Sequence, residues 1–262
     1  MGLLLGSLGP VFFVSFGLME FAGWLAILGF LAALFAEMYT ATTKPDRAWY
    51  EGRAAAESVK TLAWRYAVRG ESFEGDSEAA KLDALFVARV REVLDDLGEI
   101  ELSHSSGATT QITEPMRQLR ASPFQERLVA YRDGRIEDQR SWYESKAEWN
   151  RIRRLRWTVV VIGAEVTGVL GGVALVTGLL QLDLISVLGA FATAAIAWTQ
   201  AKQYSTLATA YGITAQELAS VAAEVSGATE ATWASFVGQA EEAISREHTL
   251  WRATRGVRIR NS

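Results

Sequence analysis

Glu165 is the residue whose type and surroundings most suggest chemistry. It lies in the apolar run Trp157–Ala201, whose only other charged residue is Asp183. If this run crosses a membrane as upright helices, Glu165 lies ~12 Å beyond Trp157 at ~1.5 Å per residue. A carboxyl group at that depth is costly and suggests a group that lines an ion path or carries a proton. The alternative is a protonated carboxyl group that hydrogen-bonds across helices, for example to Thr193 or Thr199.

Other residues offer less. Glu37 lies near the end of the first apolar stretch, where we expect it to reach the membrane surface or to pair with a basic flank. Glu241, Glu242, Glu247 and His248 resemble a metal site, but Glu247 and His248 are adjacent and face different ways on a helix. The chain has no cysteine, phosphate-binding loop or Ser-His-Asp set. We therefore expect no metal, no cofactor and no enzyme activity.

Two long apolar runs must position these groups. Leu3–Ala36 contains one charged residue, Glu20, and is too long for a single crossing of a ~30 Å hydrocarbon core, as is the run that holds Glu165. Each run therefore predicts a helical hairpin, at 3–39 and 157–201, with turns near 17–20 and 181–183. All lysines and arginines lie in 44–156 and 202–260. Because basic flanks stay on the cytoplasmic side, both termini and the 40–156 segment are predicted to be cytoplasmic.

Small residues mark the third and fourth predicted crossings. Such residues let membrane helices approach closely, either within one chain or between chains. Both readings stay open, with packing inside the chain favoured. The residues concerned are Gly163, Thr167, Gly168, Gly171, Gly172, Ala190 and Ala194.

The remaining sequence predicts helices and an all-α fold. We expect cytoplasmic helices within 46–97 (46–69 and 78–97), a loop or short strand at 98–113, and a helix over 124–156 that bends near 133–134. The 202–211 segment should continue the fourth crossing. A capping-box pattern at Thr214–Glu217 then predicts a new helix start, and Gly227 precedes a last helix near 230–255. Gln139, Tyr143, Lys146 and Asn150 form one polar stripe, a pattern typical of hydrogen bonding to neighbouring helices.

Charge excludes one class of partner. Four of the 30 acidic residues (Glu20, Glu37, Glu165 and Asp183) belong to the apolar stretches, which leaves 26 acids against 26 basic residues elsewhere. The soluble part is thus formally neutral, with mixed charges and no basic face. A nucleic-acid partner is not expected.

Particular strings resemble a known family. Trp49-Tyr50, Arg53–Thr61 and Trp64–Tyr66 resemble one unit of the SLATT family, the SMODS- and SLOG-associating two-transmembrane effector domains. Arg135–Gln139, Trp142-Tyr143, Lys146-Ala147 and Asn150 resemble a second unit, and Ala240–Thr249 with Trp251 resembles its closing helix. The residues that carry this motif are Trp49, Tyr50, Arg53, Glu57, Lys60, Trp64, Arg135, Gln139, Trp142, Tyr143, Lys146, Asn150, Glu242, Glu247, His248 and Trp251.

The resemblance implies two tandem units, 1–118 and 119–262, each with a membrane hairpin and cytoplasmic helices. It also implies a role in bacterial conflict systems, in which SLATT domains are proposed to be membrane effectors linked to nucleotide second messengers. The family has no agreed catalytic residues. It has a helix before the hairpin that this sequence lacks, so we expect that the chain begins late and that Met1 is not its natural start.

Together these features predict a four-pass effector of the bacterial inner membrane. We expect it to permeabilise or perturb the bilayer as a homo-oligomer on a cytoplasmic signal, with a nucleotide-signal sensor or synthase as a candidate partner. The alternative function is a non-conducting, membrane-anchored helical scaffold that binds a cytoplasmic partner.

Overall fold

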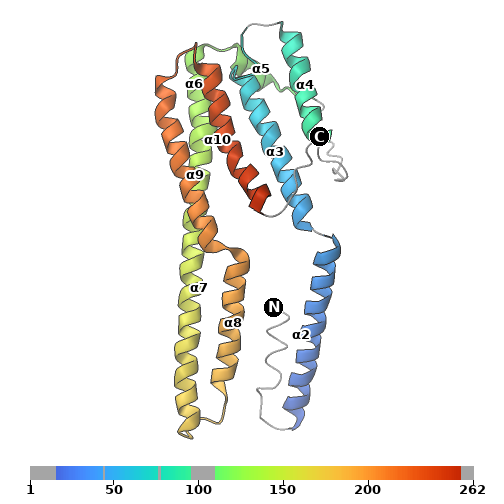
Figure 1. Ribbon diagram of the computed structural model, residues 1–262, viewed down its shortest axis with the longest axis vertical. Coiled ribbons are helices and arrows are strands. Elements are labelled where there is room, and N and C mark those ends of the chain that lie inside the picture. The colour runs from blue at the N-terminus through green and yellow to red at the C-terminus, as the bar shows by residue number, and fades with distance from the viewer. Residues whose placement is uncertain (1–15, 44, 76–77, 96–109, 255–262) are drawn as a thin grey trace. The chain divides into compact units, whose positions relative to one another are not determined.

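The protein is all-α, as predicted. The computed structural model describes residues 16–43, 45–75, 78–95 and 110–254, and these contain helices, turns and no strand. The helices are α2 (Phe16–Thr43), α3 (Pro45–Ala67), α4 (Ala79–Asp95), α5 (Glu114–Ala121), α6 (Phe124–Tyr131), the π-helical turn η2 (Arg132–Glu137), α7 (Asp138–Val176), α8 (Leu184–Lys202), α9 (Tyr204–Glu224), the 3₁₀ turn η3 (Val225–Gly227) and α10 (Trp233–Thr254) (Figure 1).

The chain forms two compact units, each built from distant parts of the sequence. One combines the described residues up to Pro45 with Lys146–Ala210, and we call it the membrane unit. The other combines Asp46–Ser145 with the described residues from Tyr211 onward, and we call it the helical body. Helices α7 and α9 each contribute residues to both units.

The membrane unit contains the apolar helices. Two continuous helical segments, Phe124–Val176 and Leu184–Gly227, are long and apolar enough to cross a membrane, and α2 carries a shorter apolar stretch, Ala26–Tyr39. Large apolar side chains on these helices are exposed, for example Phe35 at 73% and Val169 at 61%. Such exposure is unusual for a soluble surface and expected where lipid is the solvent.

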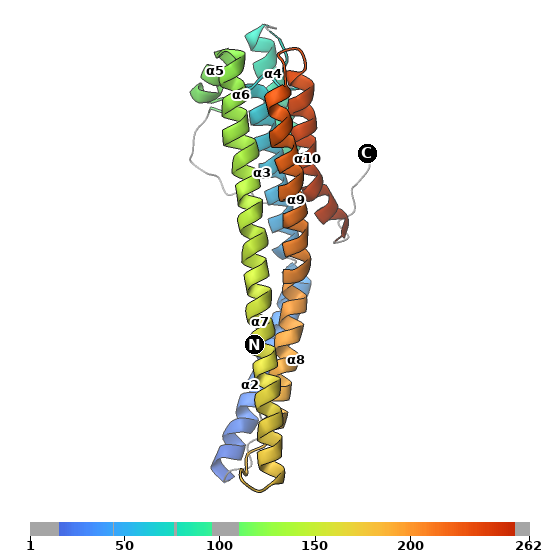
Figure 2. The ribbon, with the colours of Figure 1, turned by 90° about the vertical axis from the view of Figure 1, so that its left-hand side faces the viewer.

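The second predicted hairpin is present. Helices α7 and α8 lie side by side and antiparallel (Figures 1 and 2). The chain turns between them through Gly178, whose φ of +76° suits glycine. Asp183 then caps α8 by accepting a hydrogen bond from the Ser186 backbone N–H at 3.1 Å. The turn therefore includes the predicted 181–183 segment.

Three sequence-based boundaries were wrong. The turn predicted at 17–20 lies inside α2, because the Leu18-Met19-Glu20 run favours helix; the predicted crossing before residue 16 lies outside the described residues. Gln203 breaks the expected continuation of α8, since its backbone adopts the left-handed conformation with φ of +52°. Helix α5 was not anticipated within the first unit.

The capping-box prediction was also wrong. Thr214 lies in the middle of α9, and both Thr214 and Ala215 are buried. Ala215 and Leu218 pack with Tyr143 and Ile244 in one apolar cluster. This packing keeps the segment helical, so the local cap signal has no chain end to cap.

Two larger apolar clusters complete the helical body. One joins the end of α3 to α6, η2, η3 and α10, with Trp233 and Tyr131 among its fully buried members. The other packs Tyr66 and Phe73 against α4 through Phe86. Because each cluster joins helices far apart in sequence, the body has its own core.

The long helix predicted over 124–156 bends at the predicted place. Helix α6 passes into the π-helical turn η2, which contains Asp133 and Gly134, and continues as α7. A Cβ atom on Gly134 would lie 3.0 Å from the Trp64 ring, so glycine permits α3 to approach here. The π turn positions the residues described next.

Candidate functional site

A buried ionic cluster lies where η2 meets α3 and α10. Arg135 and Glu241 both have fully buried side chains and form a two-pronged ion pair. Arg135 Nε donates to Glu241 Oε1 at 2.9 Å, and Nη2 donates to Glu241 Oε2 at 2.7 Å. This parallel geometry is the strongest that arginine and a carboxylate can adopt.

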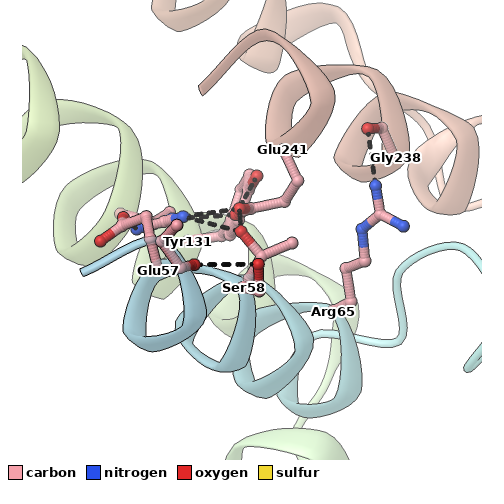
Figure 3. Close-up of polar contacts among 9 residues, drawn as sticks. Glu57, Ser58, Arg65, Tyr131, Gly238 and Glu241 are labelled. Atoms are coloured by element: carbon pink, nitrogen blue, oxygen red, sulfur yellow. Dashed lines mark hydrogen bonds and ion pairs between the residues drawn. The ribbon is translucent and has the colours of Figure 1, made fainter. Parts of the chain in front are cut away.

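Residues from α3 and α6 complete the cluster (Figure 3). Arg135 Nη1 donates to Glu57 Oε1 at 3.0 Å, and Arg135 Nη2 donates to the Thr61 hydroxyl at 3.2 Å. The Thr61 and Tyr131 hydroxyls donate to Glu241 at 2.8 and 3.0 Å. Both buried charges are thus surrounded by hydrogen-bond partners, which a buried ion pair needs if it is not to be destabilising. We call these five residues the clasp.

The electrostatics of the clasp favour fixed charges. Burial disfavours the charge on Arg135, but hydrogen bonds and ion pairs with Glu241 and Glu57 outweigh it and raise the pKa of the guanidinium. Burial, followed by the adjacent Glu241 carboxylate, raises the pKa of the Tyr131 hydroxyl well above its usual range. Both shifts move the group further from neutral pH. The clasp is therefore suited to holding helices together and unsuited to transferring protons.

The neighbouring contacts tighten the same junction. Arg65 of α3 donates to the Gly238 carbonyl of α10 at 3.2 Å (Figure 3). The buried Trp233 indole donates to the Val68 carbonyl at 2.7 Å, and Trp64 packs edge-on against Tyr131 at 5.8 Å between ring centroids. Helix α10 is thus fastened to α3 at several points along its length.

Sequence reasoning found part of the clasp. Arg135, Glu57 and Trp64 were among the family motif residues, but Glu242 was selected where Glu241 is the buried acid and Glu242 is exposed. A signal was available: Trp233, Val237 and Ile244 are buried at helical spacing, and Glu241 falls on that apolar face. A carboxylate on an apolar face indicates a buried partner.

A second polar junction holds α4 and α5. Tyr66 donates to Asp83 at 2.6 Å, and Arg117 pairs with Asp83 at 2.8 Å. Burial raises the pKa of Asp83, but the hydrogen bonds from Tyr66 and Arg117 outweigh it, so the net shift is downward. Arg120 donates to the carbonyls of Tyr66 and Phe73 at 2.8 and 3.0 Å. This junction was not predicted from the sequence.

In the membrane unit, Glu165 lies on the exposed surface of α7. Ala164, Gly168 and Gly171 are buried, whereas Glu165 is exposed beside the face that they form. Within the described residues, Glu165 has no hydrogen bond or ion pair. The hydroxyls of Thr193 and Thr199 donate to carbonyls of their own helix, those of Gly189 and Ile196.

The small residues of α7 divide into two groups. A Cβ atom on Gly171 would lie 2.7 Å from Leu184 Cβ, and Gly168 and Gly172 similarly approach Leu188 and Ile185 of α8. Gly163 has open space, and Thr167 is exposed with its hydroxyl bonded to the Gly163 carbonyl. On α8, Ala190 and Ala194 are partly buried, whereas Ala192 and Ala195 are fully buried. The glycines at 168, 171 and 172 therefore serve packing within the chain.

The remaining predicted residues are scattered. The Arg53 guanidinium lies over the Trp142 ring at 5.4 Å. Glu37 and Lys146 are exposed, Lys60 and Gln139 are partly buried, and Tyr143 and Asn150 are buried. The side chains of Trp49, Tyr50, Glu247, His248 and Trp251 lie outside the described residues. In the described part of the chain, no group of three or more His, Cys, Asp or Glu residues could hold a metal ion.

The fold and these contacts define a class: a helical protein with apolar helices that could cross a membrane and a polar helical body. Comparison with family models identifies the family. Residues 1–128 match SMODS and SLOG-associating 2TM effector domain 3, and residues 131–251 match SMODS and SLOG-associating 2TM effector domain 1. The chain therefore belongs to the SLATT family and consists of two tandem SLATT domains, as the motifs indicated. No curated protein and no solved structure matches it.

The domain matches give the clasp a further meaning. Glu57 and Thr61 belong to the first SLATT domain, whereas Tyr131, Arg135 and Glu241 belong to the second. The matches meet between residues 128 and 131, inside α6 and not at a loop. The clasp thus joins the two domains into one helical body.

Proposed function

We propose that this protein is a membrane effector of a bacterial conflict system that permeabilises the inner membrane as a homo-oligomer. In this proposal the termini and the helical body are cytoplasmic and receive the signal, and no step is catalytic. The effector description of both SLATT matches supports the class. Glu165 is the observation that supports the mechanism.

The argument from Glu165 is one of solvation. Its carboxyl group lies on an apolar helix, is exposed on the surface of the chain and has no partner in the described residues. A carboxylate facing lipid costs roughly 3 kcal/mol or more at the centre of a membrane. Contact with a second copy, or with water enclosed by several copies, removes that cost. Because α8 covers the opposite glycine face, the Glu165 side of α7 remains available for such contact.

Leakage from liposomes tests this proposal. The full chain should release an encapsulated dye, and Glu165→Gln should change the rate or ion selectivity of release. Thr167→Val, which alters an exposed hydroxyl already bonded to its own helix, is the matched control and should behave as wild type. Absence of release, with and without candidate nucleotide signals, would contradict permeabilisation.

A scaffold remains the second candidate because the helical body has its own core and interdomain clasp. In that case the membrane unit only anchors the chain, and Glu165→Gln is silent. The polar stripe from Gln139 to Asn150 is a poor partner surface, since Tyr143 and Asn150 are buried within the chain. A scaffold should instead bind its partner, a sensor or synthase of a nucleotide signal, through exposed residues of the body. Co-purification with an unchanged yield in Glu165→Gln would favour it.

A further inference from the structure

A group of basic residues lies on α7 directly before its most apolar part. Arg151, Arg153, Arg154 and Arg156 occur within six residues, and Lys202 ends the neighbouring α8. All five are exposed. They belong to the membrane unit, so their arrangement is that of one compact body.

Only one of these charges is neutralised by a carboxylate. Arg151 pairs with Glu148 at 2.7 Å, and Glu148 is the only acidic residue between 146 and 164. Arg153 instead lies over the Trp149 ring at 4.2 Å, and Lys202 lies over the Trp198 ring at 4.8 Å.

The other two basic residues likewise have no acidic partner. Arg154 approaches the Ser205 hydroxyl at 3.5 Å. Arg156 has no hydrogen bond or ion pair within the described residues. We call Arg153, Arg154, Arg156 and Lys202 the collar: four positive charges that no carboxylate in the described chain balances.

The collar lies at the level of lipid headgroups. Beyond Arg156, α7 exposes Val159 at 62% and Ile162 at 53%, which marks the start of the lipid-facing surface. At ~1.5 Å per residue, Arg153 and Arg156 are within ~9 Å of Val159 along the helix. Trp149 and Trp198, each nearly half exposed, are of the type that occupies the membrane interface. Phosphate groups are the anions found at this depth.

We propose that the collar binds the phosphates of anionic phospholipids and prefers them to zwitterionic ones. Arginine can hold a phosphate with two parallel hydrogen bonds, and the stacked tryptophan keeps Arg153 close to the surface. A basic residue beside an anionic leaflet contributes roughly a fivefold preference. The inference requires the membrane placement of α7 and α8 but is independent of permeabilisation.

Retained lipid tests the collar. The full chain is reconstituted in nanodiscs of equimolar phosphatidylcholine and phosphatidylglycerol, extracted in mild detergent and analysed for bound lipid by native mass spectrometry. Wild type should retain phosphatidylglycerol in excess, and Arg153→Gln/Arg156→Gln should lower that excess roughly 20-fold. The charge-matched control on α4, Arg89→Gln/Arg91→Gln, should retain the wild-type ratio.

Two further variants separate a site from general charge. Glu148→Gln/Arg151→Gln removes the neutralised pair without changing net charge and should keep the preference. Arg153→Lys/Arg156→Lys keeps the charges that orient α7 and should lose only part of it, so a failure of the glutamine variant to insert does not decide the test. Equal lipid ratios in wild type and both collar variants would overturn the inference. A chain that leaks dye without lipid preference would overturn the collar alone, and the reverse result would overturn permeabilisation alone.

Discussion

Replacing Glu241 with glutamine should release α10 from the helical body. The substitution keeps the shape of the side chain but removes the charge that faces Arg135 at 2.7 Å. Arg135 is then fully buried with one remaining carboxylate, that of Glu57, whose side chain is 22% exposed. The clasp would change from a compensated ion pair to a poorly compensated buried charge.

The magnitude follows from the burial of both partners. Removing one member of a buried ion pair costs about 3–5 kcal/mol. Glu57 remains in place, so we expect about 3 kcal/mol for Glu241→Gln. At about 1.4 kcal/mol per decade, this increases the population of the opened state roughly 100-fold.

Hydrogen exchange measures this opening in the intact protein. Peptides from the first part of α10, where Trp233 and Val237 are buried, should exchange roughly 100-fold faster in Glu241→Gln in detergent micelles. Glu242→Gln is the matched control: it removes the same charge from the next residue, which is exposed, and should change stability by less than about 0.5 kcal/mol.

A double variant tests the reasoning more directly. If the cost comes from an uncompensated charge, Arg135→Met/Glu241→Met should recover much of the lost protection, because apolar replacements of both partners are often tolerated. Equal exchange in Glu241→Gln and Glu242→Gln would refute the role of the buried pair. So would a double variant less stable than the sum of its single variants.

Three further predictions concern packing and pH. Gly171→Ala should destabilise the hairpin by about 1–3 kcal/mol in a thermal melt, since its Cβ would meet Leu184, whereas Gly163→Ala has open space and should not. The raised pKa of Tyr131 means that its contribution is complete below about pH 10 and lost as the pH rises above that value, and Tyr131→Phe should remove this alkaline dependence. The lowered pKa of Asp83 has the opposite sign: its contribution is present above about pH 4 and lost as the pH falls, so Asp83→Asn should flatten the acid limb of a stability profile. Unchanged pH profiles in these two variants would show that the shifts have other sources.

The sequence predicted the features that depend on composition along the chain. The all-α class and the turn near 181–183 follow from hydropathy and charge, and the break near 133–134 follows from a glycine in a helical pattern. The wrong boundaries have tertiary causes. Thr214 carries a correct local cap signal, but the packing of Ala215 and Leu218 keeps the helix continuous through it.

The clasp shows the same limit at the level of single side chains. Arg135 and Glu57 were identified as motif residues, yet no spacing rule brings two residues 78 positions apart into one hydrogen bond. Glu165 was identified because a lone carboxyl in an apolar run is visible in the sequence itself. Its lack of a partner in the described chain required the structure.

The π turn η2 also fixes the rotational phase of α7. Such a turn is equivalent to one residue inserted into an α-helix, and each residue of an α-helix advances by ~100°. Deleting Gly134 would therefore turn everything that follows in α7 by about that angle relative to α6. Tyr143 would leave its cluster with Leu218 and Ile244, although no residue that contacts it had been changed. A single-residue deletion here should be more damaging than most substitutions in the same helix.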